Sequence, residues 1–401
     1  MKKWFAILLT ICLLFTITAC KKSNTTENKQ ESTSSTTDTT TGENNNQADA
    51  PEIKQKPMVS VSLPADTKSF TADNGTVIFN HTSQHMKMIV PDPDIAEKVI
   101  IDFMTRIDSS RSAAEEIYNA AKNSYSPHSP FTPYICSITY SPQRVDLGVL
   151  SLFGNEVRYS GGAHSVVSGI SVNYDLITGN ALSLADILTE TASADSVCQL
   201  IIRALEDLSS DVTLYSDYKT TVTDNFQDKL TDINAWYLSR TGLCFYFSPY
   251  EIAPNSAGVV VVEIPYEKLT GIMEDAYFPA ERDTASGVIY ATKFDPANLD
   301  SYSQFSEIVL NNGSDQVLLY TDKSVYDVRI ESGFWSASGK VYTPISTVFA
   351  AHTLTPGDGI MAEAALTETA PALRLSYQTG NKTVYVFIAK ASDGSIQLIP
   401  A

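Results

Sequence analysis

Histidine pairs are the first place to look for chemistry in this sequence, because imidazole serves both as a metal ligand and as a base near neutral pH. His81 and His85 are spaced i, i+4, which on a helix would place both rings on one face, as zinc sites require. The surrounding residues alternate as in a strand, where this spacing converges less well, and no glutamate lies between the two histidines. We therefore expect hydrogen-bonded or solvated side chains here and no metal.

Another histidine, His164, follows two glycines in the run Tyr159–His164. Gly161 and Gly162 would let backbone N–H groups approach a ligand closely, and His164 could act as a base beside them. The sequence supplies no partner for it, neither a serine elbow nor a reactive cysteine motif. We interpret Gly161, Gly162 and His164 as a structural turn, with His164 hydrogen-bonded to order the loop.

Four carboxylates are the remaining candidates for acid–base catalysis. Asp175, Asp186, Glu251 and Glu263 could pair, but the separation that decides the chemistry cannot be read from sequence. There is also no phosphate-binding glycine loop and no dinucleotide fingerprint. We therefore expect a protein that is not an enzyme, with no catalytic residue, no metal and no cofactor.

Aromatic residues concentrate in the run Phe245–Tyr250. Period-two alternation points Phe245 and Phe247 to one side of a strand, after which Pro249 ends the strand and Tyr250 begins a loop. Tyrosine is common in interfaces because it brings a large area and a polar tip at low entropic cost. We expect Ser248, Pro249, Tyr250 and Glu251 to form a binding loop, and the alternative is that Tyr250 packs on the domain's own helix.

The elements that must position these residues follow from hydrophobic periodicity. Apolar residues at helical spacing predict helices over 95–107, extended through 117–121, then over 194–208 and 215–238. Alternation predicts strands over 59–63, 77–80, 86–90, 135–140, 146–153, 170–176, 243–247 and 259–264. Ser183 and Asp186 fit a helix N-cap with its capping partner. The order predicts an α+β fold, with an antiparallel sheet packed by helices.

Residues 288–401 change to short alternating strands separated by Gly, Pro, Asn and Asp turns, which predicts a small all-β domain. Cys136, Cys198 and Cys244 fall in the folded part, and three thiols allow at most one disulfide. We expect buried free cysteines.

The N-terminus has the form of a lipoprotein leader. Residues 1–20 begin with Lys2 and Lys3, continue as a short apolar run and end at Ile17–Cys20, so we expect Cys20 to carry a lipid anchor. Residues 21–57 are polar and predict a disordered tether. The net charge of −18 argues against nucleic acid, whose binding depends on Lys and Arg. We expect a lipid-anchored protein on the cell membrane, facing outside the cytoplasm.

Two longer runs, Gly154–Leu188 and Gly242–Leu269, resemble the extracellular domain of the RsiV-type lysozyme-sensing anti-sigma factors. A related module precedes the catalytic domain of PdaC-type peptidoglycan deacetylases. The resemblance covers roughly residues 58–280. It implies a PdaC-like module over 58–165 and an RsiV-like module over 166–280, followed by the accessory β domain over 288–401.

The resemblance implies that Ser248, Pro249 and Tyr250 help to grip lysozyme, although the family usually has proline at the position of Ser248. We expect a binding lipoprotein whose partner is a basic protein such as lysozyme, or the cell-wall polymer. The alternatives are a wall-polymer-binding or peptidoglycan-modifying protein, and a structural protein of the envelope. Because no cytoplasmic segment and membrane helix precede the domain, we do not expect it to hold a sigma factor.

Overall fold

The computed structural model describes residues 58–401 apart from 227–234, 281–285, 311–312, 337 and 340. The expected leader, Cys20 and the tether lie outside these residues. Among the residues that the structure describes, no helix is long and apolar enough to cross a membrane.

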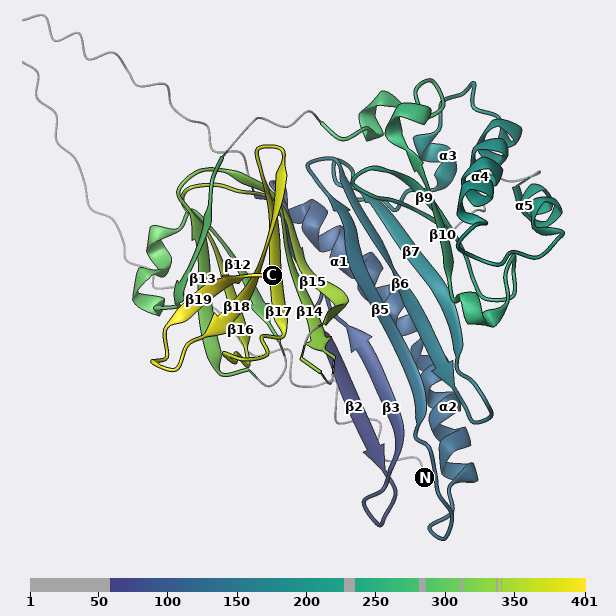
Figure 1. The fold of residues 1–401 in the computed structure, drawn as a ribbon, viewed down its shortest axis with the longest axis horizontal. Helices are drawn as coiled ribbons and strands as arrows, with labels where there is room; N and C mark the ends of the chain where they lie inside the picture. The colour runs from purple at the N-terminus through teal and green to yellow at the C-terminus, as the bar shows by residue number, and fades with distance from the viewer. Residues whose placement is uncertain (1–57, 227–234, 281–285, 311–312, 337, 340) are drawn as a thin grey trace, which may run out of the picture. The chain divides into compact units, whose positions relative to one another are not determined.

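A five-stranded sheet forms the first layer of the fold (Figure 1). All neighbours in it are antiparallel except β3 and β5, whose parallel pairing requires a crossover. Two helices supply that crossover and pack on the face of the sheet that carries Tyr140 and Leu152. In sheet order the strands are β2 (Ala65–Thr71), β3 (Val77–Gln84), β5 (Tyr134–Val145), β6 (Val149–Tyr159) and β7 (Val166–Asp175), and the helices are α1 (Pro93–Ser109) and α2 (Arg111–Ser124).

The crossover consists of two helices, α1 and α2, whereas the apolar periodicity predicted one extended helix. Asp92 caps α1 by accepting the N–H of Asp94 at 2.9 Å, and Pro93 occupies the first turn, where its missing donor costs nothing. The chain breaks at Ser110, whose hydroxyl donates to the carbonyl of Ile107 at 2.7 Å. This break lets α1 and α2 follow the sheet separately, each with its own apolar stripe against the strands.

A second, three-stranded sheet packs on the opposite face of β6, where the rings of Phe153 and Tyr237 stack at 4.6 Å. Helices cover its outer face, where Trp236, Phe245 and Ile264 are buried with Ile201. The helix predicted over 194–208 is confirmed, whereas Trp236 lies in a strand and not in the predicted helix over 215–238. The elements are α3 (Leu184–Ile187), α4 (Ala194–Leu208), α5 (Tyr218–Phe226), β8 (Trp236–Leu238), β9 (Gly242–Phe247) and β10 (Val260–Pro265).

The remaining strands form a sandwich of a seven-stranded and a four-stranded sheet around one apolar core. The seven-stranded sheet has the order β19-β18-β17-β14-β15-β1-β4, and the four-stranded sheet β11-β13-β16-β12. The strands are β1 (Ser60–Ser62), β4 (Lys87–Ile89), β11 (Ile289–Lys293), β12 (Gln304–Val309), β13 (Asp315–Thr321), β14 (Val325–Trp335), β15 (Tyr342–Leu354), β16 (Asp358–Ala364), β17 (Leu373–Thr379), β18 (Lys382–Lys390) and β19 (Ile396–Pro400). Single 3₁₀ turns lie at Asn255–Ala257, Tyr266–Lys268 and Asp275–Tyr277, and a longer one at Pro296–Ser301.

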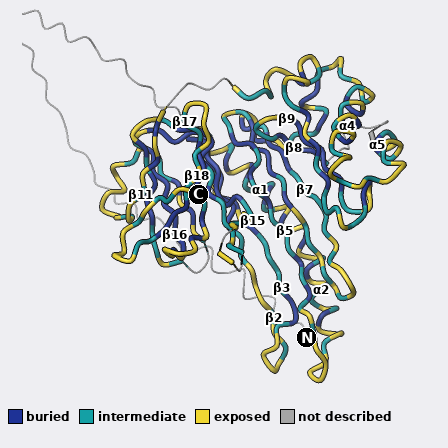
Figure 2. The backbone as a smooth tube through the Cα atoms, in the orientation of Figure 1, coloured by how far each residue is buried: buried dark blue, intermediate teal, exposed yellow. Residues whose placement is uncertain are grey.

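Strand β1 belongs to both halves of the fold. It pairs with β15, so Val61 lies opposite Ala350, and it pairs with β4 on its other edge. Met58 is buried in the sandwich core, whereas Val61 and Leu63 are buried with α1 and β5. In Figure 2, buried backbone lies around β15, the strand with which β1 pairs.

The expected domain boundaries therefore need correction. The part over 288–401 is all-β as predicted, but its seven-stranded sheet also contains β1 and β4 from the N-terminal region. The expected boundary at 165/166 falls inside the β6–β7 hairpin, where Val166 pairs with Arg158 in one sheet. The described residues of 58–401 all belong to a single compact unit. The division fails because hydrophobic patterning marks strands but does not specify which strands pair.

Candidate binding site

The turn between β9 and β10 presents the predicted binding residues. Every residue of β9 is buried, so the chain leaves the core at Ser248 and Pro249. The chain re-enters the core at Ile252 and Ala253, which are almost fully buried. Between these anchors Tyr250 is 67% exposed. The structure therefore does not support the alternative that Tyr250 packs on the domain's own helix.

Backbone hydrogen bonds fix the shape of this turn. The N–H of Glu251 donates to the Ser248 carbonyl at 3.1 Å, and the N–H of Tyr250 donates to the Ala253 carbonyl at 3.0 Å. Tyr250 has φ of +73°, a left-handed conformation that is uncommon for a residue with a side chain. A conformation that costs free energy is retained only where the surroundings determine it, and such positions cluster at functional sites.

Glu251 stabilises the turn from its side chain, because its carboxylate accepts the N–H of Ser248 at 2.6 Å. Although the residue as a whole is exposed, the carboxyl group is turned toward the backbone. Its loss of contact with water raises the pKa of Glu251, and the hydrogen bond from Ser248 offsets part of that rise. Within the turn, the Glu251 side chain therefore contacts the backbone, whereas the Tyr250 side chain is exposed to solvent.

A contact with the five-stranded sheet holds the turn in place. The Ser248 hydroxyl accepts the N–H of Gly169, on β7, at 3.3 Å. A Cβ atom on Gly169 would lie 2.5 Å from the ring of Tyr246, so the close approach requires glycine here. Gly169 lies inside the run Gly154–Leu188. Its contact with the aromatic run Phe245–Tyr250 could not be predicted from sequence, because the two runs are far apart along the chain.

The other predicted loop lies at the tip of the β6–β7 hairpin. Gly161 and Gly162 have φ of +95° and +99°, which confirms the turn. The Tyr159 hydroxyl donates to the Gly162 carbonyl at 3.2 Å, so Tyr159 orders this loop, a role that the sequence had suggested for His164. His164 is exposed, and β7 begins three residues before Gly169, roughly 10 Å along the strand. This loop and the Tyr250 turn thus adjoin the same strand at different points along it.

The candidate carboxylates each have a local structural partner. Asp175 accepts the N–H of Ile177 at 2.7 Å in a turn, and Asp186 accepts the N–H of Ser183 at 2.7 Å in the predicted capping box. Glu263 accepts the Ser239 hydroxyl at 2.6 Å. These side chains thus serve turns, caps and strand ends.

The histidine pair behaves differently from a helical metal site. His81 lies in β3 with its Nδ1 3.1 Å from the carbonyl of Cys136, and His85 lies in the loop that follows. Burial lowers the pKa of His85, and nearby Lys87 lowers it further. In the described parts of the chain, no group of three or more His, Cys, Asp or Glu is placed to hold a metal ion.

The cysteines Cys136, Cys198 and Cys244 are free and buried, in agreement with the expectation. Burial, followed by the nearby charge of Glu263, raises the pKa of the Cys244 thiol to about 12. At neutral pH this thiol is protonated, and it packs with Tyr237 and Tyr246 in the aromatic cluster between the two sheets.

Residues 185–267 match the family described as "Protein of unknown function (DUF3298)". This part of the chain is a DUF3298 domain. It runs from α3 to the turn after β10 and so contains the Tyr250 turn, whereas the hairpin of His164 lies before it. No curated protein matches the chain.

Two solved structures of DUF3298 family proteins resemble this chain. One, from Bacteroides fragilis, is 19% identical, with 55% of this chain and 95% of that one covered and a TM-score of 0.40. The other, from Pseudomonas aeruginosa, is 18% identical, with 55% and 97% covered and a TM-score of 0.38.

Proposed function

We propose that this protein is a non-enzymatic, lipid-anchored binding protein of the cell surface. In this proposal its DUF3298 domain is of the RsiV type and grips a basic protein such as lysozyme with the turn Ser248–Glu251. The observation that carries the proposal is Tyr250, 67% exposed on a backbone that hydrogen bonds hold in a left-handed conformation.

The turn suits binding because its conformation is already fixed before a partner binds. A loop that is already rigid loses less conformational entropy on association, so more of the contact energy remains as affinity. Four backbone and side-chain hydrogen bonds hold this turn, and Ile252 and Ala253 anchor its end in the core. An exposed tyrosine on such a support matches the aromatic anchors that dominate protein interfaces.

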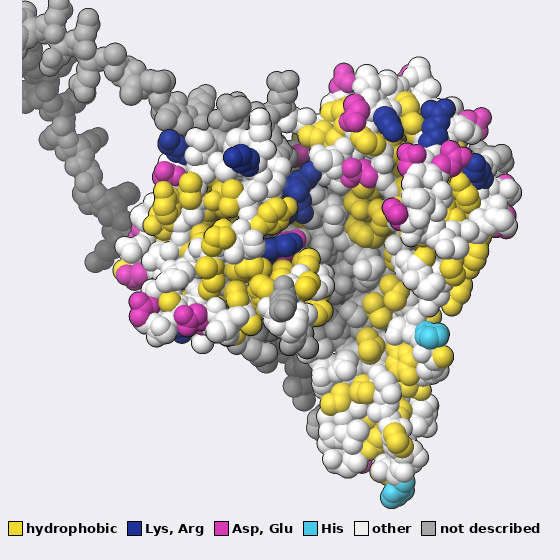
Figure 3. Space-filling view, in the orientation of Figure 1, with side chains coloured by type: hydrophobic (Ala, Val, Ile, Leu, Met, Phe, Trp, Pro, Cys, Tyr) yellow, Lys and Arg dark blue, Asp and Glu magenta, His cyan; other side chains and the backbone are white. Residues whose placement is uncertain are grey.

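Net charge supports a basic partner. The chain has a net formal charge of −18, which accelerates its encounter with a positively charged protein at low ionic strength. Figure 3 shows acidic and basic side chains interspersed on the face it displays, so no single acidic surface is offered there. Long-range attraction would thus bring the partner near, and a specific contact such as Tyr250 would have to hold it.

The test is binding of the full chain to hen lysozyme at low and at moderate salt, beside Tyr250→Ala. Tight binding that survives moderate salt and is lost in the variant would support the proposal. Tyr385→Ala is the matched control, because Tyr385 is 45% exposed on β18 of the sandwich, outside the DUF3298 domain.

Weak binding that disappears with salt and is unchanged in Tyr250→Ala would overturn recognition by the turn, because it would reflect net charge alone. Sedimentation of the protein with purified peptidoglycan would then examine the wall polymer as the partner.

A further inference from the structure

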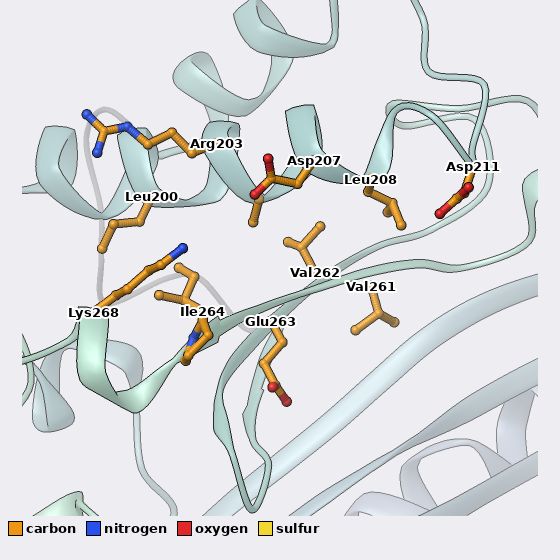
Figure 4. Close-up of a pocket in the computed structure, with 12 residues that line it drawn as sticks. Leu200, Arg203, Asp207, Leu208, Asp211, Val261, Val262, Glu263, Ile264 and Lys268 are labelled. Atoms are coloured by element: carbon orange, nitrogen blue, oxygen red, sulfur yellow. The ribbon is translucent and has the colours of Figure 1, made fainter.

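A groove lies beside β10 in the DUF3298 domain, separate from the Tyr250 turn. It runs between α4 and β10 and has a volume of about 440 Å³ (Figure 4). Its lining divides into a helix side and a strand side. From α4 and the turn that follows it come Leu200, Arg203, Ala204, Asp207, Leu208 and Asp211, and from β10 and beyond come residues 261–265 and Lys268.

The strand side of the groove is the edge of a sheet. In the order β10-β9-β8, β10 is terminal, and among the described residues it pairs only with β9. The Tyr246 N–H donates to the Ala235 carbonyl at 3.0 Å, on the β8 side, so the neighbouring residues Phe245 and Phe247 direct their backbone groups toward β10.

The register then identifies the outward-facing backbone groups. Val260 and Val262 lie opposite Phe247 and Phe245 and complete the ladder with β9. The N–H and C=O groups of Val261 and Glu263, which alternate with them, therefore point to the outer edge.

The side chains of these two residues lie on another face. Val261 packs with the aromatic cluster of Tyr237, and the Glu263 carboxylate accepts the hydroxyls of Ser239 and Thr241. What Val261 and Glu263 offer to the groove is thus their backbone.

The helix side supplies an apolar wall with a charge at each end. Leu200, Ala204 and Leu208 recur every four residues along α4 and are partly buried against the domain core. Figure 4 shows Arg203 and Lys268 toward one end of the groove and Asp211 toward the other, with Asp207 between them.

We propose that this groove binds an extended segment of a partner protein, which adds to the sheet as a strand antiparallel to β10. Backbone groups of the segment would pair with those of Val261 and Glu263, and alternate side chains would pack against Leu200, Ala204 and Leu208. Antiparallel pairing is the slightly more stable arrangement per residue. It places the start of the segment near Lys268 and its end near Asp211.

Charge complementarity then defines the occupant. The segment carries an acidic residue at its start, opposite Arg203 and Lys268, and a basic residue at its end, opposite Asp211. Alternating apolar residues lie between them. The proposal is independent of the Tyr250 turn.

The experiment selects short peptides from a random phage-displayed library against the full chain, with Ala204→Trp for counter-selection, because the indole would fill the middle of the groove. We expect the selected peptides to share an acidic start, an apolar alternation and a basic end. If no peptide prefers the native chain to Ala204→Trp, the proposal is overturned.

The best peptide is then synthesised in two forms, each N-methylated on alternate amides. A strand in a ladder directs every second N–H to its neighbour, so one form should bind at least about tenfold more weakly and the other should bind nearly as well as the parent. Equal loss or equal retention in both forms would contradict strand addition.

A variant of surface residues tests the same groove without the risk that the substitution disrupts folding. Arg203→Glu combined with Lys268→Glu changes two exposed side chains without touching the core, and it should weaken binding of the acidic-start peptide by about tenfold. Exchange of the acidic and basic ends of the peptide should restore part of that loss. Tyr250→Ala should bind the peptide like the native chain, so that a failure of the lysozyme proposal and a failure of this one can be told apart.

Discussion

Tyr250 shows at the residue scale how the binding position that we propose can cost stability. A residue with a Cβ atom in the left-handed region costs roughly 1–2 kcal/mol, whereas glycine adopts that region freely. The turn keeps a tyrosine at φ of +73° although its side chain is mostly exposed and gains little from the core. That combination fits the binding role that we propose for Tyr250, because strained backbone positions cluster at functional sites.

Tyr250→Gly should therefore be more stable than Tyr250→Ala by about 1 kcal/mol, because both remove the ring but only glycine relieves the backbone. Thermal unfolding of the two variants measures the difference, and both should lose lysozyme binding alike. Equal stability of the two variants would mean that the backbone at this position carries no strain.

Glu251 allows a prediction of pH dependence at the same scale. Its pKa is raised in the folded state, so the folded protein holds this proton more firmly than the unfolded chain does. The contribution of the group to stability is present at low pH and is lost as pH rises through the raised pKa. Glu251→Gln keeps an oxygen to accept the Ser248 N–H but cannot ionise.

The stability of Glu251→Gln relative to the native chain should accordingly rise as pH increases from below the ordinary glutamate value to neutrality. Denaturant unfolding at several pH values measures this trend. An opposite trend would mean that the hydrogen bond from Ser248 to the charged carboxylate outweighs the cost of its burial.

At the scale of elements, the DUF3298 domain is held to the five-stranded sheet by close approach of β7 to β9. Gly169→Ala would place its Cβ 2.5 Å from the Tyr246 ring, which is fixed by packing at 5.0 Å from Phe153. We expect a loss of about 1–3 kcal/mol in the free energy of unfolding, as for other overpacked sites. The Ser248 contact and lysozyme binding should weaken as well.

Gly148→Ala is the matched control, because the nearest atom to its added Cβ would be a side-chain oxygen of Asp146 at 3.8 Å. Denaturant unfolding should show a change below about 0.5 kcal/mol. If Gly169→Ala is equally mild, the two sheets can adjust their spacing, and the Tyr250 turn is less firmly positioned than its contacts indicate.

Elements that depend on local sequence were predicted well, and pairings that depend on distant segments were not. The helix over 194–208 and the capping of Ser183 by Asp186 follow from periodicity and a short-range hydrogen bond. The alternation of Val59, Val61 and Leu63 predicted a strand but could not identify β15, almost three hundred residues away, as its partner.

The same limit applies to the candidate site. The aromatic run and Pro249 predicted where a strand ends and a loop begins, and both are observed. The left-handed backbone of Tyr250 could not be predicted, because tyrosine rarely adopts it and the hydrogen bonds that impose it come from the folded turn. The groove beside β10 also depends on tertiary packing, since it needs α4 at a sheet edge.

At the scale of the whole molecule, β1 joins the sandwich to the α+β part. Met58 and Val61, three residues apart, are buried in different cores. Arg329 of β14 reaches across the same junction, donating to the carbonyls of Pro142 and Gln143 at 2.7 and 2.5 Å. Ordered segments that share a strand in this way lose contacts together, so we expect the two halves to unfold as one cooperative unit.

Two tryptophans make this cooperativity measurable, because Trp236 is buried in the DUF3298 domain and Trp335 lies in β14 of the sandwich. With Trp4 replaced by phenylalanine in both, denaturant unfolding followed by fluorescence should give the same midpoint in Trp236→Phe, where Trp335 reports, and in Trp335→Phe, where Trp236 reports. Val61→Ala should lower the stability by about 1–3 kcal/mol and move both midpoints together. Ile177→Ala, at a side chain 75% exposed, should move neither. If Val61→Ala shifts only one reporter, the sandwich is an independent domain after all, and β1 belongs energetically to one side of the junction.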